Sequence, residues 1–144
     1  MRTGLILAAV AVASLAAGAV HAEVLHFTAK LNGAAETPPN DSKGTGMAMV
    51  SLDTATKKLE WKVDYSGLSG PATMAHFHGP APAGKAAGVA VALSDAASGA
   101  KGSATLTDEQ IGQLKSGMWY VNVHTAAHPG GEIRGQVMAA KGGM

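Results

Sequence analysis

The chain has 144 residues and a formal net charge of +1, from 11 lysines and arginines and 10 aspartates and glutamates. This length fits one domain of ordinary size. The sequence contains no cysteine, which excludes a disulfide scaffold, a thiolate metal site and a cysteine nucleophile. The basic residues are scattered along the chain and form no cluster. The sequence therefore does not favour a nucleic acid as a partner.

The first 22 residues have the features of a secretory signal peptide. A short, positively charged start is followed by an almost uniformly apolar stretch over residues 4–17, and residues 20–22 (Val-His-Ala) have the small-residue form of a cleavage site. The apolar stretch is marginal for the roughly 20 residues that a membrane-spanning helix needs. We therefore expect cleavage after Ala22. The remaining domain, residues 23–144, is expected to be periplasmic or secreted and not associated with a membrane.

Apolar and polar residues alternate with a period of two in several segments, which is typical of half-buried strands. In residues 58–65, the apolar residues Leu59, Trp61 and Val63 alternate with charged ones, and residues 25–32 show the same alternation. Further strands are expected over residues 46–53, 72–78, 88–93, 102–106, 118–125 and 132–138. Eight strands in one domain predict an all-β fold, an antiparallel β-sandwich with Greek-key-like connections.

One short helix is expected between these strands. Thr107 can cap its N-terminus with Gln110 as the capping-box partner, and Gly117 ends it. Residues 36–41 include two adjacent prolines, which cannot continue a ladder of strand hydrogen bonds. That stretch is expected to form a loop.

Four histidines form two close pairs, His76 with His78 and His124 with His128. Residues two apart in a strand point to the same face, so His76 and His78 project side by side, with Met74 beside them. A Pro-Gly-Gly turn after the second pair could bring His128 back over His124. Imidazole is the commonest protein metal ligand and suits copper and zinc alike. The sequence therefore predicts a metal site formed by all four histidines, with copper as the favoured ion and zinc as the alternative.

Other polar and sulfur-containing residues have simpler first interpretations. Glu132 and Arg134 lie two apart on an expected strand, which favours a surface ion pair of little energetic weight. Glu36 precedes the two prolines and either folds over the histidine site or ends a turn. His26 lies on the outward face of the first strand and is expected to be a surface residue. Three methionines carry thioethers that suit Cu(I), but core filling is their first interpretation: Met47, Met49 and Met74.

Several stretches resemble a known family. They are residues 31–39, residues 75–81, and residues 120–125 together with residues 129–136. In this order they closely resemble the CHRD domain, a module first described in chordin and common as a single exported bacterial domain. The resemblance covers residues 24–137 and implies an extracellular or periplasmic β-sandwich.

The resemblance also implies a narrower histidine site. The positions that match the family pattern are His76, His78, His124, Glu36, Glu132 and Arg134. His128 occupies a position where other members often have a different residue, which makes it an addition in this chain. Whether His128 and Glu36 join the site is left open.

Three functional hypotheses follow from these features. The first is an exported metal-binding protein, with copper favoured, that acts in metal storage, tolerance or delivery. The second is a non-catalytic module that binds a protein partner or matrix and whose histidines are structural. The third is a metalloenzyme like superoxide dismutase, which also presents an H-x-H pair on a β-sandwich; this comparison rests on fold alone. The sequence has no recognisable second cluster of histidine and aspartate ligands for zinc, and no cysteines to brace a loop around the site. An enzyme is therefore less favoured than a binding protein, and no catalytic residue is assigned.

Overall fold

The computed structural model describes residues 11–14 and 21–141. The signal peptide expected over residues 1–22 lies mostly outside these ranges, so its cleavage stays a prediction. No helix in the described ranges is long and apolar enough to cross a membrane.

Nine strands and two short helical segments follow one another in the described part of the chain. In order they are β1 (Val24–Asn32), η1 (Gly33–Ala35), β2 (Thr45–Asp53), β3 (Lys58–Ser66), β4 (Ala72–His78), β5 (Val89–Ala92), β6 (Lys101–Thr105), α1 (Asp108–Lys115), β7 (Tyr120–Thr125), β8 (Ile133–Gln136) and β9 (Met138–Ala139). The expected strands are therefore all present, with ends shifted by one or two residues. The last one is split into β8 and β9.

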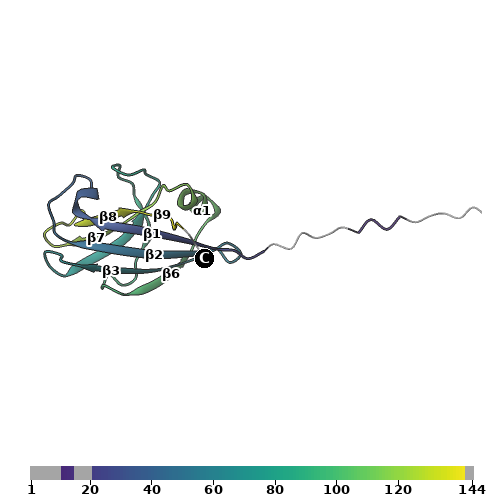
Figure 1. Ribbon diagram of the computed structural model, residues 1–144, viewed down its shortest axis with the longest axis horizontal. Coiled ribbons are helices and arrows are strands. Elements are labelled where there is room, and N and C mark those ends of the chain that lie inside the picture. Colours follow the sequence, from purple (N-terminus) through teal and green to yellow (C-terminus); the bar gives the residue numbers. More distant parts are fainter. Residues whose placement is uncertain (1–10, 15–20, 142–144) are drawn as a thin grey trace, which may run out of the picture.

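The strands pair antiparallel in the order β5-β4-β7-β8-β1-β2-β3-β6, and β9 pairs with β1. Figure 1 shows β1, β2 and β3 side by side, with β6 beyond β3. A single register pair, Asn32 with Arg134, joins β1 to β8 and thereby links the two halves of the sheet. The all-β antiparallel fold with one short helix is confirmed. The two sheets expected of a sandwich are joined into one sheet that nearly closes on itself.

Apolar side chains from both halves of the sheet meet in one core. Leu59, Trp61 and Val63 are buried, as their alternation predicts. Trp61 of β3 contacts Phe77 of β4 edge to face, with ring centroids 5.4 Å apart. Because neighbouring residues of a strand point to opposite faces, the inward direction of Phe77 turns the residues on either side of it outward.

The helix has the cap that its sequence predicts. The backbone N–H of Gln110 donates to Thr107 Oγ1 (3.2 Å), and the Thr107 N–H donates to Gln110 Oε1 (2.9 Å). These bonds satisfy two backbone groups that an uncapped helix start would leave without partners. Gly117 follows the helix with a positive φ of 73°, a conformation that favours glycine.

Two loops cover the outward face of β4, β7 and β8: the loop between η1 and β2, and the loop between β4 and β5. Arg134 reaches both: its Nη1 donates to Thr37 Oγ1 (3.0 Å) and its Nη2 to the Pro82 carbonyl (3.3 Å). The Ala87 N–H donates to the Tyr120 hydroxyl (3.1 Å). A second, polar layer is therefore buried between this face and the loops: Glu36, His78, Asn122, His124 and Arg134.

Glu132 and Arg134 do not form the expected surface ion pair. Their exposed fractions are 0% and 1%, and Glu132 lies just before β8. Arg134 bonds to the covering loops, whereas Glu132 bonds to hydroxyl groups elsewhere. The interpretation as a surface pair is wrong because the loops fold back over this end of the sheet.

The Glu132 carboxylate holds three segments together. It accepts hydrogen bonds from Ser42 Oγ (2.8 Å), Thr125 Oγ1 (2.8 Å) and both the N–H (2.9 Å) and the hydroxyl of Ser69. Burial by itself acts to raise the pKa of Glu132, but the hydrogen bonds from Ser69, Ser42 and Thr125 outweigh it and lower that pKa to about 2. The ionised carboxylate therefore stabilises the fold.

The substitution Glu132→Gln is expected to lower the free energy of unfolding at pH 7 by about 2 kcal/mol, because an amide cannot accept all of these hydrogen bonds. The folded pKa lies below the usual value of about 4.3. The stabilisation is therefore complete above that value and is lost as the pH falls towards about 2. Urea unfolding across this range measures the difference between wild type and variant, which should shrink with acidification.

The control is Glu60→Gln on β3, since Glu60 is exposed and pairs only with Lys58 at the surface. Such an exposed pair contributes between about 0 and 1 kcal/mol. Equal effects of the two substitutions at pH 7 would contradict the structural role of Glu132.

Candidate metal site

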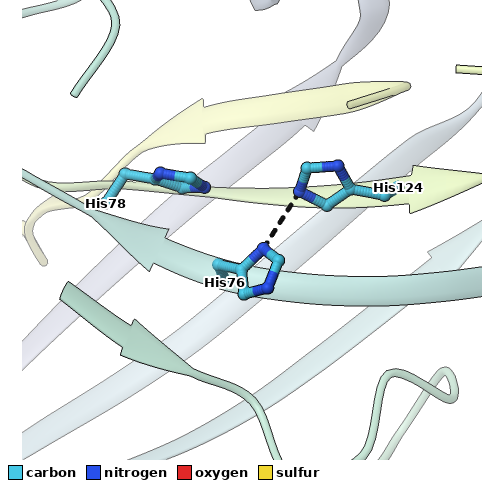
Figure 2. A group of neighbouring side chains, drawn as sticks. All are labelled: His76, His78 and His124. Atoms are coloured by element: carbon cyan, nitrogen blue, oxygen red, sulfur yellow. Dashed lines mark hydrogen bonds between the residues drawn. The ribbon is translucent and has the colours of Figure 1, made fainter. Parts of the chain in front are cut away.

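Three of the predicted histidines lie together on the outward face of the β4–β7 pair. Figure 2 shows His76 and His78 on one strand and His124 on its neighbour, with their rings turned toward one another. Each offers a ring nitrogen, and these three nitrogens all lie within 4.8 Å of one another. The antiparallel register produces this cluster, because it places Asn122 opposite His76 and leaves His124 diagonal to it.

Two of the three rings have a defined tautomer. His78 Nδ1 lies 3.0 Å from the Ala87 carbonyl oxygen, and His124 Nδ1 lies 2.8 Å from the Pro129 carbonyl oxygen. A carbonyl oxygen only accepts hydrogen bonds, so both Nδ1 atoms carry the proton. In the neutral rings, Nε2 then has the free lone pair. Metal-ligating histidines almost always donate their other ring N–H to a carbonyl or carboxylate in this way.

The third ring, His76, lies so close to His124 that the two could bind one metal ion. His76 Nδ1 lies 3.1 Å from His124 Nε2, drawn as the dashed line in Figure 2. Because a neutral His124 already donates from Nδ1, it accepts this bond and His76 donates it. Two nitrogens bonded at about 2.0 Å to a tetrahedral ion would be roughly 3.3 Å apart. An ion could therefore take the place of this hydrogen bond with little movement of either ring, provided that the single ring proton of His76 moves from Nδ1 to Nε2.

The side chain of Asn122 is hydrogen-bonded to Nε2 of His78, the nitrogen that would bind a metal ion. His78 Nε2 lies 3.0 Å from Asn122 Oδ1. A neutral His78 needs a donor at Nε2, which the Asn122 amide supplies when its oxygen and nitrogen are exchanged, an assignment set by the hydrogen-bond network. Ligation through His78 Nε2 requires this amide to turn away. Asn122 thus keeps the ring in position when no ion is bound.

The surroundings favour the neutral form of His76 and His78. Burial, together with the neighbouring His124 and His78, lowers the pKa of His76 below its usual value. Burial also lowers the pKa of His78, although its hydrogen bonds to Ala87 and Asn122 oppose the shift. A protonated imidazole cannot bind a metal ion. The lowered pKa values of His76 and His78 therefore favour metal binding by these two rings at neutral pH.

A stack of three side chains fixes the orientation of His78. Its ring lies parallel to that of Tyr120, with centroids 4.7 Å apart and an angle of 5° between the planes. The Arg134 guanidinium covers this tyrosine ring at 3.5 Å from its centroid, a cation–π contact. Since Arg134 is itself held by both loops, the loops determine the ring position of His78 through the stack.

Glu36 lies close to the cluster without joining it. It is buried, and its Oε1 atom has no hydrogen-bond partner among the residues that the structure describes. Burial is the largest effect and raises the pKa of Glu36, while the hydrogen bond from the Thr37 N–H and the charge of Arg134 oppose the shift. Of the two possibilities that the sequence left open, the structure shows that Glu36 ends a turn: it follows η1, and its backbone N–H donates to the Gly33 carbonyl (3.2 Å), while its side chain is buried beside Asn122.

The structure places the other candidates elsewhere. His128 is outside the group of three: its Nε2 lies 4.0 Å from Glu132 Oε1, and its backbone closes a turn with Thr125. His26 is exposed, as expected. The interpretation of three methionines as core residues is wrong, because each projects from the outward face of a strand with an exposed fraction of 37% to 60%: Met47, Met49 and Met74.

Sequence reasoning missed the groups that orient the histidines. Asn122 and Tyr120 alternate with buried valines on β7, and this alternation already puts them on the same face as His124. That periodicity was the available signal. The carbonyls of Ala87 and Pro129 carried no such signal, because only the folded loops bring them to the rings.

The comparisons with known proteins identify a family. The CHRD domain family matches residues 27–137, which is most of the chain. Searches of curated proteins and of solved structures found no match. With a match of this extent, the chain belongs to the CHRD domain family.

Proposed function

We propose that this protein is an exported metal-binding protein that uses His76, His78 and His124 to bind a transition metal ion, with copper favoured, in metal storage, tolerance or delivery. Export to the periplasm or the outside of the cell rests on the composition of residues 1–22. The metal site rests on the geometry of the three rings.

One observation carries the proposal: His78 and His124 each donate Nδ1–H to a backbone carbonyl, which leaves Nε2 as the nitrogen for a metal ion, and the three histidines offer ring nitrogens within 4.8 Å of one another. Histidines that only stabilise turns would need a single hydrogen bond each and would gain nothing from meeting. Three imidazoles whose ligand nitrogens lie within 4.8 Å of one another, two of them with the proton held on Nδ1, instead match the ligand arrangement of a metal site.

Copper is favoured by the chemistry of the ligand set. The three ligands are imidazoles without a carboxylate or thiolate, and imidazole suits both copper and zinc. For the same nitrogen ligands, the affinity of divalent ions rises to a maximum at Cu²⁺ and falls again at Zn²⁺. Zinc is therefore expected to bind the same residues more weakly.

The first test is a titration of the domain without a histidine tag. One equivalent of Cu(II) should bind, with nitrogen coupling in the electron paramagnetic resonance spectrum. The double substitution His76→Ala with His78→Ala should abolish this binding, because it leaves one ligand of the three. Elemental analysis after dialysis gives the stoichiometry.

The matched control is His26→Ala, which removes an exposed histidine of β1 outside the cluster. Its copper binding should equal that of the wild type. Stoichiometric copper binding that survives the double substitution would refute the three-histidine site.

Copper affinity should depend on pH in a defined direction. The pKa values of His76 and His78 lie below the usual value of about 6.5, so these rings stay neutral at more acid pH than ordinary histidines. Binding should therefore persist at pH 6.5 and be lost only below it, as the rings take up protons. Competition titrations against a chelator of known affinity, made from pH 7.5 to 5, measure this midpoint. A loss above pH 7 would show that other groups bind the metal.

A further inference from the structure

We infer that the thioether of Met74 is a fourth ligand of this site, which makes it selective for Cu(I) over Zn(II). This inference rests on the three-histidine site proposed above and adds a residue that lies outside that set.

The strand register places Met74 against the cluster. On the β4–β7 pair, Met74 is directly opposite His124, and the side chains of such a pair share one face with Cβ atoms about 4.5–5.5 Å apart. Met74 is also two residues before His76 on the same strand, so both point outward. A methionine has three rotatable side-chain bonds. Its sulfur can therefore reach an ion held between His76 and His124.

Packing does not explain this methionine. Met74 is 49% exposed, while the inward positions of β4 are occupied by the buried Ala75 and Phe77. The register of β4 against β7 shifts between Ala72 and Met74, and such irregularities often redirect a side chain beside a functional site. An exposed thioether beside the imidazoles of His76 and His124 has a chemical use, whereas in the core it would only fill space.

Other donor groups near the cluster are already engaged or lie on the covered side. Glu132 is held by Ser42, Ser69 and Thr125. Glu36 is buried beside Asn122 under its loop. On the opposite side of β4 from β7, the strand β5 offers only the methyl group of Ala92 beside His76. His128 turns toward Glu132, whereas Met74 is a donor-bearing side chain on the exposed side of the site.

Ligand softness then determines the preferred ion. Thioethers are soft ligands that select Cu(I), whereas Zn(II) is satisfied by imidazole nitrogens and water. Three imidazoles with one thioether give four neutral ligands, so a singly charged ion adds less net charge to this partly buried site than a divalent one. Both effects favour Cu(I).

The test compares Met74→Leu with Met49→Leu. Leucine keeps the approximate volume and removes the sulfur. Met49 is a matched control because it is exposed on β2, where its strand neighbours are Thr28 and Lys62. Affinities for Cu(I) are measured under reducing conditions by competition with a chromogenic chelator, and affinities for Zn(II) in parallel. X-ray absorption of the Cu(I) complex reports whether a sulfur atom binds the ion.

We expect Met74→Leu to weaken Cu(I) binding by at least about tenfold, to remove the sulfur signal and to leave Zn(II) binding unchanged, while Met49→Leu has no effect. A wild-type Cu(I) complex with only nitrogen ligands, or equal Cu(I) affinity in the two variants, would overturn the role of Met74 and leave the three-histidine site standing. If neither copper nor zinc binds the wild type, the proposed function fails together with this inference.

Discussion

The register of β4 against β7 is the constraint on which the site depends. Pairing of Phe77 with Val121 places both side chains in the core, and the same register turns His76, His78 and His124 outward together. A slip by one residue would send every side chain of a strand to the opposite face. The apolar residues between the histidines therefore fix where the imidazoles point. The same pairing of β4 with β7 therefore forms part of the core on one face of the sheet and the histidine cluster on the other.

The polar side chains buried between the sheet and its covering loops determine the tautomers and orientation of the histidine rings. Loops that return from distant parts of the sequence supply the Ala87 carbonyl and cover Arg134, and Glu132 ties three further segments together. Buried polar groups are costly unless they are satisfied, so this layer holds its members in fixed positions. It sets the tautomers of His78 and His124 and the orientation of the His78 ring. The other side of the cluster, near Met74, is exposed.

The sequence predicted what depends on local periodicity. Alternation over residues 58–65 and 72–78 gave the strands, their inward faces and the shared direction of His76 and His78, and the capping box gave the helix. The sequence did not predict the burial of Glu132 and Arg134, because hydrogen bonds to residues as distant as Ser42 create it. It also placed His128 near His124, whereas the turn after β7 directs that ring toward Glu132. Three exposed methionines were expected in the core because methionine usually fills space there, although the alternation with buried residues places them on the outward faces of β2 and β4.

The central claim is that three histidines, two of them with a fixed tautomer, form a metal site, and nitrogen NMR of the imidazoles tests it most directly. In the metal-free protein at neutral pH, His78 and His124 should carry the proton on Nδ1. Addition of one equivalent of a diamagnetic ion, Cu(I) or Zn(II), should shift the Nε2 signals of both rings and leave their Nδ1 atoms protonated. The opposite tautomer in both rings, or Nε2 signals that do not respond to either ion, would contradict the account.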